Sequence, residues 1–184
     1  MLMRGFSLLE VLIAMAISSV LLLGASRFLP ALQRGVLAQT QQQTLEDDLW
    51  LRVFTVAKHL QRAGYCGDDD CDGEALQIAQ QGQCVIARWD GDSNGLWQTS
   101  PADEADSIGF RLQSGVLETL RGATTCEGKG WDKMTDPAAL TVTSFQVVRH
   151  TFSGFPPELA ITLSATGTRG GRVTAQYGVT GYNQ

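Results

Sequence analysis

Residues 1–26 read MLMRGFSLLEVLIAMAISSVLLLGAS, and this stretch decides the architecture of the 184-residue chain. As a helix, the 21 residues from Phe6 to Ser26 would span roughly 31 Å, which matches the hydrocarbon thickness of a bilayer. Residues 6–26 contain one charged side chain, Glu10, and a carboxylate inside a membrane is costly unless it finds a partner. The sequence therefore predicts a membrane-crossing helix over 6–26 whose one acidic group has a specific use.

Two simpler interpretations compete for this segment. A cleaved secretory signal peptide would combine the basic Arg4 with the apolar run and the small residues Gly24-Ala25-Ser26. A plain signal anchor would keep the run as a permanent helix, but Arg27 and Arg34 after the span against Arg4 before it leave its orientation ambiguous. Neither interpretation explains Glu10.

The same residues resemble the signal of type IV prepilins, in which a short leader ends in Gly, a hydrophobic residue follows, and Glu stands fifth in the mature chain. Here those positions are Gly5, Phe6 and Glu10. The resemblance implies that a prepilin peptidase cuts the leader 1–5 after Gly5 and methylates the amine of Phe6. It also implies a single pass through the inner membrane with the C-terminal domain in the periplasm. Glu10 is then expected to pair with the Phe6 amine of a neighbouring subunit and so to fix the register of assembly.

The helix is expected to continue over 27–64 as an amphipathic segment, with a bend permitted at Pro30. Apolar residues recur there at spacings of three and four, which places one stripe on a helix that Gly64 ends. The stripe consists of Leu45, Leu49, Val53, Val56, Leu60 and Ala63. The opposite face is predicted to be solvated, and we expect His59 to lie on the surface between Lys58 and Arg62.

The head, residues 65–184, changes to short runs of β-branched and aromatic residues separated by Gly, Asp, Pro and Ser, which predict strands. The runs cover residues 84–89, 108–112, 116–120, 140–150, 159–165 and 173–177. Ser114-Gly115 and Arg169-Gly170-Gly171 are expected to form hairpin turns. A long helix followed only by strands predicts an α+β fold with the apolar stripe packed on a mostly antiparallel sheet.

The composition excludes several classes of protein. With 43% hydrophobic and 18% charged residues and a mean hydropathy of -0.04, the chain is neither disordered nor a multi-span membrane protein. Its 14 Lys and Arg against 19 Asp and Glu give a net charge of -5, and its densest charge cluster is acidic, at Asp68–Asp70 and Asp72. Nucleic-acid binding is therefore not expected, because it requires a basic face.

The four cysteines, Cys66, Cys71, Cys84 and Cys126, fit disulfides formed in an oxidising compartment. Three pairings are possible. We favour Cys66 with Cys71, which closes a small loop, and Cys84 with Cys126, which ties a strand to a distant loop. The chain contains no C-x-x-C motif, so a cysteine-ligated metal is not expected.

Asp90, Asp92 and Asn94, followed by Gly95, resemble the opening of a calcium-binding loop. The twelfth position of that loop, where a bidentate Glu is required, is Pro101. A turn between two strands accounts for the same residues without a metal. Calcium at these three residues and a bare turn both remain as interpretations, and no other cofactor is expected.

The sequence around Ser93 also matches G-x-S-x-G, and Asp132, Asp136 and His150 follow it in the order found in α/β hydrolases. That motif requires a turn from a strand into a helix, and the residues after Gly95 have no helical period. We therefore expect no enzyme. A membrane-anchored periplasmic hydrolase or binding protein is the alternative from another functional class.

Blocks further along the chain narrow the resemblance. The segments WLRVFTVAKHLQRAGY (50–65), IGFRL (108–112), LRGATTCEGKGW (120–131) and SFQVVRH (144–150) resemble minor type IV pilins related to the J-type minor pseudopilins of type II secretion. The resemblance implies a subunit that primes or caps pilus assembly together with other minor pilins, the major pilin and an inner-membrane assembly platform. A type II secretion minor pseudopilin is the alternative within the class.

Overall fold

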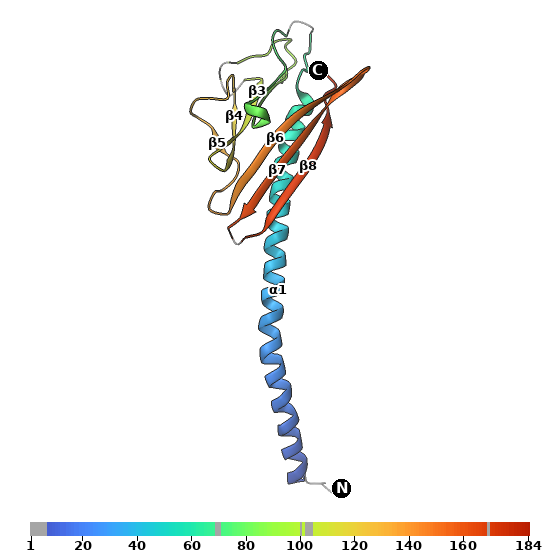
Figure 1. Cartoon of the computed structure of the whole chain (residues 1–184), viewed down its shortest axis with the longest axis vertical. Helices are drawn as coiled ribbons and strands as arrows, with labels where there is room; N and C mark the ends of the chain where they lie inside the picture. Colours follow the sequence, from blue (N-terminus) through green and yellow to red (C-terminus); the bar gives the residue numbers. More distant parts are fainter. Residues whose placement is uncertain (1–6, 69–70, 100, 102–104, 169) are drawn as a thin grey trace. The chain divides into compact units, whose positions relative to one another are not determined.

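A computed structural model describes residues 7–68, 71–99, 101, 105–168 and 170–184. Internal contacts divide the chain into two units, residues 1–43 and residues 44–184. One helix, α1 (Leu8–Arg62), contributes to both units and is continuous through Pro30, as Figure 1 shows. The two units are described separately.

The first unit is helical from Leu8 onward, and every side chain from residue 8 to residue 43 is exposed. The backbone carbonyl of Ser7 accepts hydrogen bonds from the N–H groups of Glu10 and Val11 at 3.0 and 3.3 Å, which closes the first turn. Among the described residues, α1 is the helix long and apolar enough to cross a membrane. From residue 8 to residue 43 this unit buries no side chain, so its apolar side chains require lipid or other helices around them.

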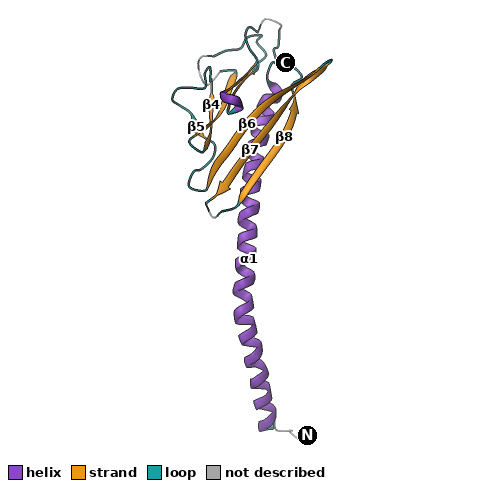
Figure 2. Ribbon diagram, in the orientation of Figure 1, coloured by secondary structure: helices purple, strands orange, loops and turns teal. Residues whose placement is uncertain are grey.

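The second unit packs the C-terminal part of α1 against two antiparallel sheets (Figure 2). The five-stranded sheet has the order β1-β2-β3-β4-β5, and the three-stranded sheet has the order β6-β7-β8. A 3₁₀ turn, η1 (Gln80–Gly82), follows β1. The strands are β1 (Leu76–Ala79), β2 (Cys84–Arg88), β3 (Ser107–Gln113), β4 (Val116–Arg121), β5 (Asp132–Lys133), β6 (Leu140–Phe152), β7 (Phe155–Gly167) and β8 (Arg172–Thr180).

The predicted apolar stripe of α1 forms the centre of the head. All six of its residues are buried, and Leu49, Val53 and Leu60 are fully enclosed. They share one hydrophobic cluster with residues of both sheets, among them Phe110 of β3 and Phe145 of β6. The α+β layout expected from the sequence is thus confirmed, with the helix covering sheets rather than standing apart from them.

The opposite face of α1 is less polar than the sequence predicts. Leu51 and Phe54 lie there with 57% and 48% of their surfaces exposed. Phe54 contacts Tyr177 of β8 edge to face, with ring centroids 5.1 Å apart. This side of the helix therefore presents apolar surface beside the last strand.

Residues near the C-terminus complete the end of α1. The helix ends at Arg62, and Gly64 adopts a positive φ of +89°, where a Cβ would collide with the carbonyl oxygen of Asn183. The side-chain amide of Gln184 donates a hydrogen bond to the carbonyl of Leu60 at 3.3 Å. Glycine is thus required at the helix exit by both the backbone conformation and the close approach of the chain.

The strand predictions hold for all six runs, although β6, β7 and β8 are longer than expected. Ser114 and Gly115 both have positive φ and join β3 to β4 as a two-residue hairpin, as predicted. Arg169, in the other predicted turn, lies outside the described residues. The short strands β1 and β5 were not expected, since four residues and two residues are too few to form a visible pattern.

Candidate functional site

Glu10 lies in the first turn of α1, where its negative charge is favoured by the helix dipole. Its side chain is exposed, and among the described residues no hydrogen bond or ion pair involves its carboxylate. The next charged residue along the helix is Arg27, which lies about 25 Å further on at 1.5 Å per residue. A cation for Glu10 must therefore come from the N-terminal residues or from another molecule.

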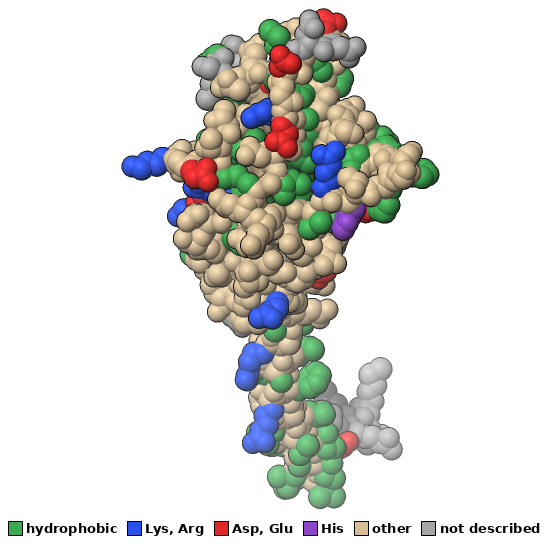
Figure 3. All heavy atoms as spheres, turned by 45° about the horizontal axis from the view of Figure 1, so that its top comes forward, with side chains coloured by type: hydrophobic (Ala, Val, Ile, Leu, Met, Phe, Trp, Pro, Cys, Tyr) green, Lys and Arg blue, Asp and Glu red, His purple; other side chains and the backbone are tan. Residues whose placement is uncertain are grey.

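The helix surface around Glu10 is apolar and shallowly hollowed. Small side chains at Ala14 and Ser18 follow Glu10 on the same face, and larger ones border them. The lining is completed by Val11, Met15, Ser19 and Leu22. Figure 3 shows hydrophobic side chains gathered over the N-terminal part of α1. Another helix can approach closely along such a face, because small side chains let backbones come together.

The predicted processing residues, Gly5 and Phe6, lie outside the described residues. Cleavage after Gly5 and methylation of Phe6 therefore stay predictions. Once such cleavage has occurred, the amine of Phe6 stands four residues before Glu10, which is about one helical turn.

Two disulfides stabilise the head. Cys66 pairs with Cys71 across five positions, and Cys84 pairs with Cys126 across 42. This is the pairing favoured from the sequence, and it leaves none of the four cysteines free. The second bridge joins β2 to the loop between β4 and β5, where the guanidinium of Arg111 donates to the Cys126 carbonyl at 2.8 Å.

The loop after β2 is organised by the buried carboxylate of Asp90. Its Oδ2 accepts hydrogen bonds from the backbone N–H groups of Gly67 and Gly95, both at 2.8 Å, and its Oδ1 accepts one from Asn94 at 3.1 Å. Asn94 in turn accepts a bond at its Oδ1 from the N–H of Leu96. The side chains predicted as calcium ligands are thus already used by the backbone that surrounds them.

Asp106 adds a third carboxylate to this loop. The oxygens of Asp90, Asp92 and Asp106 lie within 4.8 Å of one another, a grouping that a cation could join. The Asp106 oxygens, however, accept the backbone N–H groups of Gly91 and Gln98, each at 3.0 Å. These bonds hold the loop as a turn without a metal, and each Asp106 oxygen keeps a second lone pair that a calcium ion could use, so the turn and the calcium site both stay predictions.

The electrostatics of Asp90 follow from the same contacts. Burial opposes the charged form, but the hydrogen bonds from Gly67, Gly95 and Asn94 outweigh it and hold the pKa of Asp90 below its ordinary value. Asp90 is therefore an anionic anchor that fixes the loop to the chain around Gly67. This structural role is one that the spacing of the motif does not reveal.

The residues of the hydrolase alternative do not form a catalytic group. The hydroxyl of Ser93 bonds with Tyr65 at 3.2 Å, whereas His150 lies on β6 opposite Glu158 of β7. Within the described part of the chain no hydrogen bond joins Ser93 to His150, and no helix follows Gly95. Nothing in this geometry supports nucleophilic catalysis, which needs the nucleophile and its base within hydrogen-bond reach.

The prediction that His59 lies on the surface is wrong. Its ring is partly buried between Trp89 and Phe110, with centroid distances of 5.1 and 5.7 Å. Its Nδ1 is buried without a hydrogen-bond partner among the described residues. Burial, together with the positive charges of Arg62 and Lys58, lowers the pKa of His59 to about 4. His59 flanks the apolar stripe, and the aromatic residues that enclose it come from distant strands and loops.

Comparisons with known proteins address the whole chain. A family model described as prepilin peptidase-dependent protein B matches residues 38–181, and one described as the prokaryotic N-terminal methylation motif matches residues 2–26. The curated prepilin peptidase-dependent protein B of Escherichia coli (strain K12) is 62% identical over 182 residues, which cover 98% of this chain and 97% of that protein. No solved structure matches the chain.

Proposed function

The chain belongs to the prepilin peptidase-dependent protein B family, and on that premise we propose that it is a minor pilin that initiates type IV pilus assembly in the inner membrane. The observation that carries the proposal is Glu10, a carboxylate without a partner among the described residues and on an otherwise apolar helix surface. A carboxylate inside a membrane is costly unless it finds a cation, and in this proposal a second molecule supplies that cation.

In this proposal a prepilin peptidase cuts between Gly5 and Phe6 and methylates the new amine. The match of the N-terminal methylation motif to residues 2–26 supports this step. Cleavage removes Arg4, so the side-chain charge of the mature chain becomes 13 − 19 = -6. The amine remains basic enough to carry a positive charge near neutral pH.

The amine of Phe6 in one subunit then pairs with Glu10 of its neighbour. Two apolar helices slide past each other at little cost in lipid, because no hydrophobic force fixes their offset. A buried charge pair does fix it, since shifting the helices leaves two uncompensated charges, which costs several kcal/mol. Each new subunit is thereby placed at one defined height relative to the last.

The head is proposed to lie in the periplasm, where disulfides persist. The two bridges, Cys66–Cys71 and Cys84–Cys126, support that location. There the head would select its neighbours, namely other minor pilins and the major pilin, above the inner-membrane assembly platform.

The test replaces Glu10 with Leu in the full chain and uses Glu46→Leu, an exposed helical acid in the head, as the matched control. We expect Glu10→Leu to insert and to yield N-methyl-Phe6 by mass spectrometry, yet to reduce the number of pili per cell at least tenfold. The length of the remaining pili should not change, since initiation affects filament number. Glu46→Leu should behave as wild type.

Normal pilus numbers with Glu10→Leu would contradict the role of Glu10. A mature chain that starts at Ser26 or keeps Met1 would contradict prepilin processing. Normal pili combined with a secretion defect in a strain lacking the protein would instead identify a type II secretion pseudopilin.

A further inference from the structure

The strand β8 forms an edge of the three-stranded sheet, with β7 as its neighbour. Long strand edges in proteins are usually protected by Lys, Pro, bulges or covering segments. β8 is nine residues long, its sequence RVTAQYGVT contains no Pro and one charged residue, Arg172 at its start, and its pairing with β7 runs without a bulge. An unprotected edge of this length is a site where another strand can pair.

The backbone groups available at this edge follow from the register. The N–H of Gly167 bonds to the carbonyl of Gly171, and the N–H of Gly181 bonds to the carbonyl of Pro157, at 2.8 and 2.9 Å. Antiparallel pairs alternate between bonded and non-bonded types. The N–H and C=O groups that point away from β7 are therefore those of Thr174, Gln176, Gly178 and Thr180.

Other edges in the described part of the head are shorter or already engaged. β1 has four residues and β5 has two. β6 is interrupted by a register shift between Val142 and Ser144, and its Val142 N–H donates to the carbonyl of Gly115 in the turn between β3 and β4. β8 is therefore the edge best suited to a partner strand.

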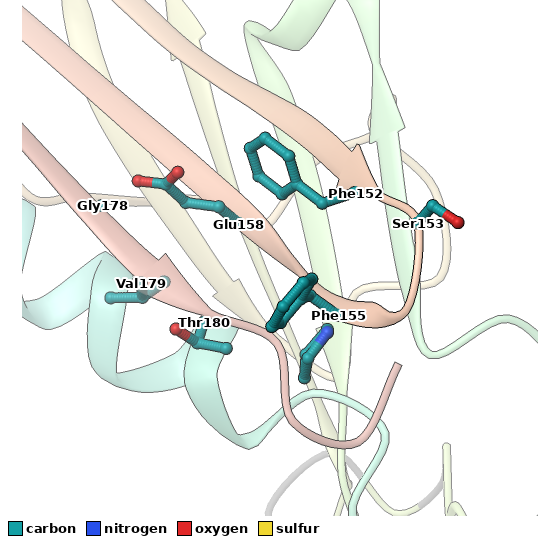
Figure 4. Close-up of a pocket in the computed structure, with 8 residues that line it drawn as sticks. Phe152, Ser153, Phe155, Glu158, Gly178, Val179 and Thr180 are labelled. Carbon is teal, nitrogen blue, oxygen red and sulfur yellow. The ribbon is translucent and has the colours of Figure 1, made fainter.

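A carboxylate without a partner lies over this edge. Glu158 of β7 is exposed, and among the described residues nothing donates to its carboxylate. Its Oε1 occupies the place where a Cβ on Gly178 would be, so the absence of a side chain at Gly178 lets the carboxylate reach across β8. Figure 4 shows the carboxylate of Glu158 pointing toward Gly178.

The surroundings of Glu158 fit a basic side chain. A hollow of about 500 Å³ next to it is lined by Phe152 and Phe155, which are 54% and 75% exposed. A Lys or Arg placed there gains an ion pair with the carboxylate, and aromatic faces add to the attraction.

The inner face of β8 fits an apolar side chain rather than a basic one. Tyr177 points toward α1 and contacts Phe54. A residue opposite Tyr177 on an added strand would have its Cβ about 5 Å from that of Tyr177, beside the exposed apolar surface of Phe54 and Leu51. An incoming strand is thus best matched when apolar residues facing inward alternate with a basic residue facing outward.

We propose that β8 binds an extended segment of a partner protein as a fourth strand, with a Lys or Arg of that segment on Glu158 and its apolar residues beside Phe54. This docking site lies in the head, apart from Glu10, and does not depend on the proposed role in initiation. The partner is defined by this pattern of an extended segment with one basic residue among alternating apolar ones.

The test measures fluorescence anisotropy of labelled, end-blocked nine-residue peptides of alternating Val and Thr, with Lys or Glu in place of the central Thr, against the full chain in detergent. The Lys peptide is expected to bind the wild type about tenfold more tightly than the Glu peptide. Glu158→Gln should remove that preference, whereas Glu127→Gln, an exposed acid after β4, should keep it. Gln176→Pro removes an outward N–H and should weaken both peptides at least fivefold.

Each variant is compared with wild type for intact disulfides and thermal midpoint, and Thr174→Pro replaces Gln176→Pro should the latter fail to fold. Absence of saturable binding by the Lys peptide would overturn the proposal, as would equal binding of both peptides by the wild type. Self-association of the full chain that Gln176→Pro abolishes, without peptide binding, would assign the edge to a second copy and would also overturn it.

Discussion

Residues 8–43 and residues 44–62 belong to the same helix but differ in what surrounds their apolar side chains. In the first stretch every side chain is exposed, including a long run of Leu, Val and Ile. In the second the apolar residues form a single stripe that two sheets cover. The apolar stripe of the second stretch is covered by the sheets of the same chain. The apolar side chains of the first stretch have no such cover among the described residues. The first depends on lipid and on other molecules.

Among the predictions that compare the two units, the largest change in the free energy of unfolding is expected from removing a disulfide of the head. Replacing Cys84 and Cys126 by Ser removes a bridge across 42 positions, which is expected to lower the free energy of unfolding by about 4 kcal/mol. Removing Cys66–Cys71, across five positions, should cost only about 2 kcal/mol. Urea unfolding of the full chain in detergent, followed by tryptophan fluorescence, measures both.

All four tryptophans lie in the second unit, so their fluorescence reports the head alone. The helix of the first unit should keep its far-ultraviolet circular dichroism at the urea concentration where the head unfolds. Equal losses for the two disulfide variants would show that loop length does not set the stabilisation.

The next largest effect compares two leucines on the same helix. Leu49 is fully buried in the head, whereas Leu21 is 67% exposed in the first unit. Leu49→Ala is expected to lower the unfolding free energy of the head by about 3 kcal/mol through lost burial and a residual cavity. Leu21→Ala should change it by less than about 0.5 kcal/mol. A similar loss from both substitutions in the same urea experiment would refute the separation of the two units.

The next prediction concerns the contribution of Asp90 to the stability of the loop after β2. Asp90→Ala leaves the N–H groups of Gly67, Gly95 and Asn94 without their acceptor, and we expect a loss of about 2 kcal/mol in the thermal or urea unfolding of the head. Asp92→Ala, at an exposed position, is the matched control and should cost less.

The same unfolding measurement, repeated with calcium and with a chelator, tests whether this loop binds calcium. We expect no change in the midpoint, since the backbone hydrogen bonds to Asp90 and Asp106 already hold this loop without an ion. A calcium-dependent rise that Asp90→Ala abolishes would reinstate the calcium site.

The smallest effect concerns pH. The pKa of His59 is about 4 in the folded head, below its ordinary value near 6.5. Its contribution to stability is therefore complete above pH 6.5 and is lost as the pH falls toward 4, because the unfolded chain binds a proton that the folded head excludes. Allowing for screening at this partly exposed ring, we expect a loss of about 1 kcal/mol between pH 7 and pH 5.

The control for this prediction is the other histidine. His59→Gln should flatten the pH dependence of the urea midpoint over this interval, and His150→Gln, at an exposed position on β6, is the matched substitution. A pH dependence that survives in His59→Gln would assign the effect to other groups.

Much of the fold could be predicted because its signals are local. The apolar run from Phe6, the stripe from Leu45 to Ala63 and the Ser114-Gly115 hairpin each depend on residues within a few turns or positions of one another. The contact between Phe54 and Tyr177 of β8 could not be predicted, because it joins residues 123 positions apart. β1 and β5 were missed because their pairing partners, rather than their own sequences, determine them.

The same distinction applies to the candidate sites. The motif of Gly5, Phe6 and Glu10 lies within six consecutive residues, so a single sequence reveals it. Asp90 could not be assigned in this way, because one of its partners, Gly67, lies 23 positions earlier. His59 likewise depends on Trp89 and Phe110, which tertiary folding brings to it.

The contact of Gln184 and Asn183 with the end of α1 has a consequence for biosynthesis. The helix is made first, but Asn183 and Gln184, which contact its end at Gly64 and Leu60, are translated more than a hundred positions later. During translation, this end of the helix therefore lacks these two contacts until the three-stranded sheet has been made. A chain that stops before Asn183 lacks the Gln184 donor at the Leu60 carbonyl, which then accepts only the N–H of Ala63 among the described residues.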